Sequence, residues 1–270
     1  MRQVPVLAGA AAFALFGGAM VRHFESLAAR DIKSKLTDAH AKVSVRTVPH
    51  GLFGHLSGDL DKVTITAANF STPGLPLFTE PDRSTQGKAR HVIIDLEDFN
   101  LAQLHVASLQ ASIPDCRYDF PLAKKKGKIR LSRAGTGTGE VTILGPDLEK
   151  FILAKFHEIK RVSVHLQDGR VQVEGYGEFI VVKANFKVDA ELIAVDGTKL
   201  SLADTHIEFD NKQATDVAAD ALLKTLNPVV DLDKDLHLYG AIQVNKITLD
   251  QDRLTASGAT TIPVLPTLQP

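Results

Sequence analysis

The chain has 270 residues, and its 31 Lys and Arg balance 32 Asp and Glu to give a formal net charge of −1. This balance excludes a generally basic nucleic-acid binder, which needs a positive field over its surface. The single cysteine, Cys116, excludes an intrachain disulfide and a cysteine zinc site. Hydrophobic residues make up 44% of the chain, which is typical of a globular protein rather than a disordered one.

The first segment has the pattern of an export signal. Residues 4–21 carry no charge and follow Arg2, which predicts a secretory signal peptide or signal anchor over residues 1–21. A buried core helix is the alternative, but such a helix should have a polar face, and this segment has none. Whether the segment is cleaved stays open. No linker rich in Pro, Gly or Ser divides the remainder, so we expect residues 22–270 to form a single elongated β-rich domain.

Hydrophobic periodicity predicts one helix and then a series of strands. Apolar residues recur at every fourth position over residues 22–39, which predicts an amphipathic helix. From residue 43 the period changes to two, most clearly at 180–192, where every even residue is apolar. A strand of that length spans about 43 Å and must coil strongly. Asp168-Gly169 and Asp196-Gly197 separate alternating arms and predict hairpin turns.

Two short helices interrupt the strands, at residues 147–156 and 216–226. They are too few to supply a crossover after every strand of a parallel sheet. We therefore expect an α+β, mainly β fold, in which a long coiled antiparallel sheet wraps around two short helices, with an N-terminal helix. Residues 128–133 and 139–144 are predicted to be paired arms, with the glycine-rich stretch at 134–139 as their hairpin tip.

The apolar face of such a sheet must be covered, because each fully buried Val, Leu or Ile contributes about 1.5–3 kcal/mol. Each inner helix supplies roughly 18 Å of length at about 1.5 Å per residue, which is short beside the longest strand. A curled sheet only partly filled by helices would leave an apolar channel suited to acyl chains, since dispersion needs no fixed geometry. The alternative, which the pattern alone favours, is a fully packed sandwich or barrel.

Five segments occur in a characteristic order: an opening strand with a Pro/Gly loop, a hairpin, a long strand with its Asp-Gly turn, a helix ending in Leu-Asn-Pro and a final strand pair. They are VSVRTVPHGLFGHLSGDLDKVTI (43–65), RVSVHLQDGRVQVEG (161–175), ANFKVDAELIAVDGTKLSLADTHIEF (184–209), ALLKTLNPVVDL (221–232) and GAIQVNKITLDQDRLTASG (240–258). This ordered set resembles the LmeA-like family of bacterial phospholipid-binding proteins. The resemblance covers about residues 43–262.

The resemblance implies a β-rich fold of the tubular lipid-binding class, with no enzymatic activity of its own. Its implied partners are a phospholipid or lipid-linked glycan and the membrane surface. The implied location is the periplasm or cell envelope, either free or anchored to the cytoplasmic membrane by the N-terminal segment. We accordingly expect a non-enzymatic lipid-binding or lipid-transfer protein with acyl chains between sheet and helices. The candidate lining residues are Phe151, Ile180, Val182, Phe186, Val188, Leu222 and Leu226.

Two kinds of surface residue are candidates for contact with a membrane. Apolar residues on loops rich in Pro and Gly can dip into a bilayer or fold back on the core. These are Leu52, Phe53, Leu75, Leu77 and Phe78. Lysines near one another can contact anionic head groups or mark a solvated turn. These are Lys124, Lys125, Lys126 and Lys128.

Two other functions remain as alternatives. One is a ligand-free structural or scaffolding envelope protein with a closed core. The other is an envelope hydrolase, for which His50, His55 or Asp carboxylates would have to gather in a cleft. The sequence has no GxSxG motif and no histidine pair at helical spacing, so it predicts no catalytic residue, no metal site and no cofactor. Cys116 is interpreted as a small buried hydrophobe.

Overall fold

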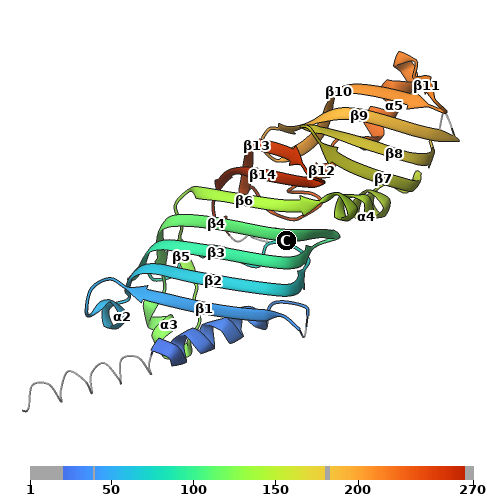
Figure 1. Cartoon of the computed structure of the whole chain (residues 1–270). Helices are drawn as coiled ribbons and strands as arrows, with labels where there is room; N and C mark the ends of the chain where they lie inside the picture. The colour runs from blue at the N-terminus through green and yellow to red at the C-terminus, as the bar shows by residue number, and fades with distance from the viewer. Residues whose placement is uncertain (1–20, 39, 180–182, 265–270) are drawn as a thin grey trace, which may run out of the picture.

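The protein is elongated and mostly β, with two coiled sheets that follow one another along the molecule (Figure 1). The structure, a computed structural model, describes residues 21–38, 40–179 and 183–264. The predicted fold class is confirmed, since coiled, mainly antiparallel strands pack against short helices and an N-terminal helix. The division of the strands between two sheets is a feature that hydrophobic alternation did not predict.

The helices and strands occupy most of the described chain. The helices are residues 21–33, α2 (Gly54–Ser57), α3 (Phe120–Lys126), α4 (Gly145–Lys155) and α5 (Asp216–Leu226). The strands of the first sheet are β1 (Lys42–Pro49), β2 (Asp59–Thr72), β3 (Gly87–Leu101), β4 (Leu104–Tyr118), β5 (Leu131–Arg133), β6 (Gly137–Leu144), β13 (Ile242–Asp250) and β14 (Arg253–Thr260). Those of the second are β7 (Ile159–Gln167), β8 (Arg170–Glu178), β9 (Lys183–Val195), β10 (Lys199–Phe209), β11 (Lys212–Gln213) and β12 (Val230–Asp231).

The first sheet has the order β1-β2-β3-β4-β6-β14-β13, with β5 paired to β4. Its β2–β3 pair is parallel, whereas we expected antiparallel pairs throughout. A parallel pair needs a crossover of about a dozen residues or more, and residues 73–86 supply it. Thr79 in this crossover forms bridges with Leu131 and Val264, so the crossover lies across the first sheet rather than as a free loop.

The second sheet has the order β11-β10-β9-β8-β7, and its hairpin turns meet the edge of the first sheet. Asp168-Gly169 and Asp196-Gly197 all have positive φ, which confirms both predicted turns. The amide of Gly169 donates to the Leu249 carbonyl at 3.1 Å, and the amide of Val244 donates to the Gly197 carbonyl at 2.8 Å. Because Val244 and Leu249 lie in β13, the two sheets are joined by backbone hydrogen bonds.

The two predicted inner helices are confirmed as α4 and α5. The Thr215 hydroxyl accepts from the Ala218 amide at 3.4 Å and caps α5 at its N-terminus. The N-terminal helix is shorter than predicted and ends at residue 33. Beyond it, the Thr37 amide and hydroxyl both donate to the Ser71 carbonyl, which ties this part of the chain to β2 instead of continuing the helix.

The predicted hairpin around residues 134–139 is wrong. Strands β5 and β6 do not pair with each other, since each pairs with β4. Gly137 and Gly139 lie inside β6, where added Cβ atoms would collide with the Ser112 carbonyl oxygen and the Thr260 hydroxyl oxygen, respectively. These glycines therefore permit close approach of neighbouring strands and side chains rather than a turn. Helix α3, which covers most of the predicted lysine turn, was also missed.

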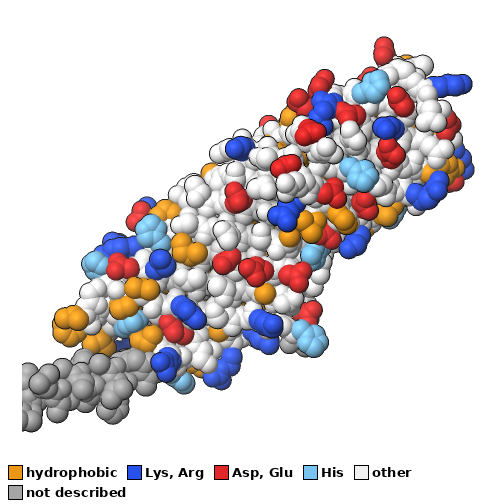
Figure 2. Space-filling model, viewed as in Figure 1, with side chains coloured by type: hydrophobic (Ala, Val, Ile, Leu, Met, Phe, Trp, Pro, Cys, Tyr) orange, Lys and Arg blue, Asp and Glu red, His pale blue; other side chains and the backbone are white. Residues whose placement is uncertain are grey.

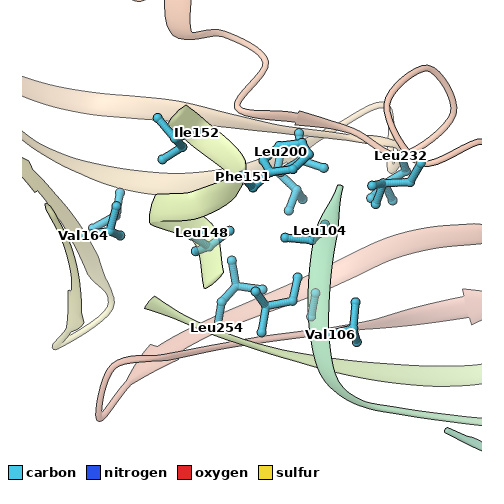
Figure 3. Close-up of a cluster of buried hydrophobic side chains, with 14 of the residues drawn as sticks. Leu104, Val106, Leu148, Phe151, Ile152, Val164, Leu200, Leu232 and Leu254 are labelled. Carbon is cyan, nitrogen blue, oxygen red and sulfur yellow. The ribbon is translucent and has the colours of Figure 1, made fainter. Parts of the chain in front are cut away.

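Apolar side chains fill the interior in two clusters. The larger cluster draws on both sheets, α4, α5 and the segment after α5. Figure 3 shows its centre, where Phe151 and Leu148 of α4 lie between Val164 and Leu200 of the second sheet and Leu104 and Leu254 of the first. The smaller cluster packs the helix of residues 21–33 and α3 against the β1 end of the first sheet. None of the described helices is long and apolar enough to cross a membrane.

Candidate functional site

Helix α4 is held firmly between the two sheets. At its first turn the Asp147 carboxylate is 8% exposed and lies 2.9 Å from Nδ1 of His105, whose Nε2 lies 3.0 Å from Asp98. Glu149 accepts a hydrogen bond from the Val164 amide of β7 at 2.8 Å. A carboxylate near a helix N-terminus is stabilised by the helix dipole. These contacts fix α4 to both sheets, through β4 and β7.

Lys155 fixes the other end of α4. Its ammonium donates to the carbonyls of Pro228 and Val229 at 2.9 and 3.1 Å and to the Asp235 carboxylate at 2.6 Å. Asp235 also accepts from the Asp231 amide at 2.8 Å. The lysine thus ties α4 to the segment that follows α5. Sequence reasoning missed this clamp, because nothing in the local pattern distinguishes Lys155 from a solvated lysine.

Helix α5 is anchored far less well. Only Leu222 and Leu226 are buried, and Val217 in its first turn is 80% exposed. Within the described residues, its side chains form no ion pair, and the hydrogen bond of the Thr225 hydroxyl stays within the helix. At its C-cap, the Asn227 side chain pairs with the Leu202 backbone of β10 at 2.8 and 3.0 Å. Since few buried apolar contacts mean a low free energy of local opening, we expect the rest of α5 to open more readily than α4.

Five of the predicted lipid-lining residues lie together in the larger cluster. Phe151 is one of the buried residues of α4, and Leu222 and Leu226 are those of α5. Phe186 and Val188 of β9 belong to the same cluster, with 2% and 0% exposure. Ile180 and Val182 lie outside the described residues. The structure therefore brings the five described positions into one apolar interior, and their contact with a lipid stays a prediction.

The expected open channel is absent from the described part of the chain. Between α4, the second sheet and the segment after α5 there is a void of about 30 Å³, here called the central void, and every side chain around it is apolar. The smaller cluster encloses about 20 Å³. Ligand pockets usually measure about 300–1,000 Å³. The two inner helices alone are too short to cover the sheets, and crossover 73–86, the segment after α5 and the coiling of the sheets cover the rest.

The largest hollows lie on the outer faces of the sheets. One of about 800 Å³ follows the row Asp95, Gln110, Glu140 and Ser257, and one of about 480 Å³ lies over Glu174 and Lys187. By strand alternation these side chains point away from the apolar clusters. Their linings mix polar and small residues with a few apolar ones, among them Ile93 and Ile94 in the first and Val162 and Phe186 in the second. Both hollows are open to solvent, so neither encloses an acyl chain in an apolar space.

The predicted membrane-contact residues fall into two groups. Leu52 and Phe53 are 97% and 64% exposed in the turn before α2. Leu75, Leu77 and Phe78 lie in crossover 73–86 and are half-buried: Leu75 and Leu77 pack against the two apolar clusters, and Phe78 contacts the Tyr239 ring at 5.8 Å. The crossover thus folds back on the core, whereas the turn before α2 does not.

The predicted head-group residues lie on and just after α3. Lys124, Lys125 and Lys126 form its last turn and are exposed, and none has an ion-pair partner among the described residues. Lys128 is also exposed, but its ammonium lies 4.0 Å from the Asp31 carboxylate, which pairs with Arg130 at 2.8 Å. Burial alone would raise the pKa of Asp31, but the hydrogen bond and charge of Arg130 outweigh it and lower this pKa.

The described residues do not assemble the cleft that a hydrolase needs. His50 pairs with Asp61 at 2.8 Å on the surface, and His55 contacts the Thr47 hydroxyl at 3.3 Å. His105 lies between two carboxylates with no hydroxyl in its hydrogen-bond set. Cys116 is fully buried, and burial raises the pKa of its thiol to about 11. Among the described residues, no cluster of His, Cys, Asp and Glu suits a metal ion.

Comparison with known proteins identifies the family of this chain. No curated protein and no solved structure matches the chain. The model of the LmeA-like phospholipid-binding family matches residues 84–259, a span that begins just before β3 and reaches β14. This span includes α4, α5, the central void and the whole second sheet. Because it makes up well over half of the sequence, the chain belongs to the LmeA-like phospholipid-binding family.

Proposed function

We propose that this protein binds phospholipid without chemical conversion and holds its acyl chains beneath α5, as a storage or transfer protein of the bacterial cell envelope. The observation that carries the proposal is the central void, an entirely apolar space beside an inner helix with only two buried residues. The family supports phospholipid as the ligand. The uncharged segment 4–21 supports export and a place at the membrane.

Binding requires the interior to open, because the central void is about a tenth of the smallest usual ligand pocket. Outward movement of α5 would expose the surface that Leu222 and Leu226 now cover. An acyl chain would then bury the same apolar area, at about 25 cal/mol per Å², with no directional contact needed. Helix α4 would stay in place, since His105, Val164 and the segment after α5 all hold it.

The test is to extract the purified full chain with organic solvent and to identify and count phospholipid by mass spectrometry. A phospholipid with a photoactivatable acyl chain would then show by peptide mapping which segments it contacts. We expect stoichiometric phospholipid, and labelling of peptides from α4, α5 and β9. No recoverable phospholipid, or labelling confined to the outer faces of the sheets, would contradict the proposal.

Two substitutions on α5 separate the apolar interior from the surface of the same helix. Leu222→Gln places an amide on the face of α5 that would cover the acyl chain, and it is expected to lower bound phospholipid at least about fivefold, because an unpaired polar group against an apolar surface costs about 1–3 kcal/mol. Val217→Gln changes an exposed residue and should bind as the unchanged protein does. Circular dichroism verifies that the sheets stay folded. Equal binding by both variants would place the lipid elsewhere.

We also expect hydrogen exchange to differ between the two inner helices. Amides of α5 should exchange faster than those of α4, because α5 has fewer buried contacts and local opening exposes it first. Added phospholipid should slow exchange in α5 more than in α4. Hydrogen-exchange mass spectrometry of peptides covering the two helices measures this. If α4 exchanged as fast as α5, α5 would not be the moving element.

A ligand-free structural protein is the second candidate, and the close packing of the described interior favours it. The same extraction separates the two functions, since a structural protein would yield no stoichiometric lipid. A lipid-linked glycan in place of a phospholipid would be recognised by its mass. Fractionation of cells into cytoplasm, periplasm and membrane tests the envelope location, and recovery of the mature chain in the cytoplasm alone would contradict it.

A further inference from the structure

One end of the molecule carries exposed apolar and basic side chains side by side. Leu52, Phe53 and Leu56, here called the apolar tip, are 97%, 64% and 45% exposed. Helix α2 lies beside α3 at this end (Figure 1). The lysine cluster, Lys124, Lys125 and Lys126, forms the last turn of α3. Figure 2 shows orange and blue side chains gathered over the same end.

Tight packing holds the apolar tip and the lysine cluster at a fixed distance. Gly58 ends α2 with a positive φ, and an added Cβ there would meet the Phe120 ring of α3 at 2.5 Å. The Tyr118 hydroxyl donates to the Gly58 carbonyl at 3.2 Å, and the Tyr118 ring packs edge-on against Phe120. These contacts fix the C-terminal end of α2, next to the apolar tip, against the first residue of α3.

The N-terminal segment joins the described chain at this same end. A pocket of about 110 Å³ is lined by Val21 together with His55 of α2 and Lys124 of α3. Val21 is the last residue of the uncharged segment 4–21. If this apolar segment is retained as an anchor, the bilayer that receives it lies next to α2 and α3.

We propose that the apolar tip and the lysine cluster form one docking surface for an anionic phospholipid bilayer. Leu52, Phe53 and Leu56 enter the boundary between head groups and acyl chains, while the lysines contact lipid phosphates. The lysine cluster has no ion-pair partner among the described residues, so its charge is free to meet a negative surface. The second sheet, with α5, lies at the other end of the elongated molecule, away from the bilayer (Figure 1). The inference rests on the proposed function only in taking phospholipid as the partner.

The chain contains no tryptophan, so a single introduced one reports on its own position. The experiment uses the full chain carrying Leu52→Trp and vesicles of phosphatidylglycerol mixed with phosphatidylcholine. We expect a blue shift of emission and quenching by acyl chains brominated near the head group. Val217→Trp, on exposed α5 at the other end, is the matched control and should show neither change. This probe separates insertion of the apolar tip from any attachment through the N-terminal segment.

Charge is tested in the Leu52→Trp background. Lys124→Gln, Lys125→Gln and Lys126→Gln together should weaken the vesicle-induced shift about a hundredfold in lipid concentration, since each lysine near an anionic surface contributes roughly fivefold. Neutral phosphatidylcholine vesicles should give a similarly weak shift. The triple substitution changes exposed residues only and should leave the melting temperature unchanged.

Four results would overturn the proposal. They are no shift for Leu52→Trp with anionic vesicles, an equal shift for Val217→Trp, a shift insensitive to the lysine substitutions, or a shift that grows with protein concentration without vesicles. The last result would assign the apolar tip to contact with a second copy of the chain. Stoichiometric phospholipid in the extract together with no insertion of the apolar tip would leave the proposed function standing and reject docking alone.

Discussion

Phe151→Ala is expected to lower the free energy of unfolding of the lipid-free protein by about 3–5 kcal/mol. Phe151 is 2% exposed and lies at the centre of the larger cluster, where α4 meets both sheets. Removing its ring loses the transfer free energy of a large apolar group and leaves a cavity that the fixed helix cannot close. Urea denaturation followed by circular dichroism measures the change.

Leu153→Ala is the matched control for this prediction. Leu153 lies on the same helix but is 40% exposed, so its removal should change the free energy of unfolding by no more than about 0.5–1 kcal/mol. Added phospholipid should restore part of the stability lost in Phe151→Ala, since a ligand that binds only the folded state stabilises it. Equal effects of the two substitutions would show that α4 is not the central support of the interior.

Lys155→Met is expected to destabilise the protein by about 2–4 kcal/mol, because it leaves two carbonyls and the Asp235 carboxylate without their charged donor. The side chains of Lys155 and Asp235 are each 22% exposed, so water replaces part of the lost interaction and keeps the effect below that of a fully buried pair. Methionine keeps the length and the apolar contacts of the lysine stem. Thermal and urea unfolding measure the loss.

Lys150→Met separates the clamp from an ordinary surface lysine of the same helix. The Lys150 side chain is 75% exposed and lies 3.3 Å from Asp147, whose carboxylate is 8% exposed and keeps its contact with His105, so losing the exposed lysine should cost only about 0–1 kcal/mol. Lys155→Met should also speed exchange of a fluorescent phospholipid, since Lys155 restrains the segment after α5. A Lys155→Met protein as stable as Lys150→Met would contradict the assigned role of the clamp.

The spacing of apolar residues was enough to predict most strands and the two inner helices, because strands repeat every two residues and helices every three or four. In β9 the even residues Ala184, Phe186, Val188 and Ala190 are buried, as the period of two requires. The N-cap of α5 at Thr215 and the two Asp-Gly turns could also be predicted, because each depends only on the conformation of a few adjacent residues. These features depend on neighbours within a few residues, which the sequence shows directly.

Features set by distant partners could not be predicted. Gly137 and Gly139 resembled a hairpin tip, but close approach by Ser112 and Thr260 places them inside β6. The parallel β2–β3 pair depends on where crossover 73–86 lies across the first sheet, and local alternation contains no such information. For the same reason helix length alone suggested an open channel, although loops distant in sequence fill the space.

The candidate sites divide in the same way. Phe151, Leu222 and Leu226 were predicted because they lie on the apolar faces of α4 and α5, whose positions follow from the spacing of apolar residues. The apolar tip and the lysine cluster were predicted separately, but their proximity depends on packing between Gly58 and Phe120. Leu56, which shares the exposed surface of Leu52 and Phe53, was missed because a single leucine among polar residues carries no periodic signal.

The hydrogen bonds between the second sheet and β13 have a consequence for edge-to-edge pairing between molecules. An open strand edge offers unpaired amides and carbonyls, and it invites growth into fibres. Here the turns at Gly169 and Gly197 form hydrogen bonds with β13, the edge strand of the first sheet, so part of this edge is already paired within the protein. At the opposite edge of the first sheet, the Glu25 carboxylate accepts a hydrogen bond from the Thr47 amide of β1 at 2.6 Å. Strand β1 ends at Pro49, which has no amide hydrogen to donate. These contacts leave fewer unpaired backbone groups at the two edges of the first sheet for another strand to join.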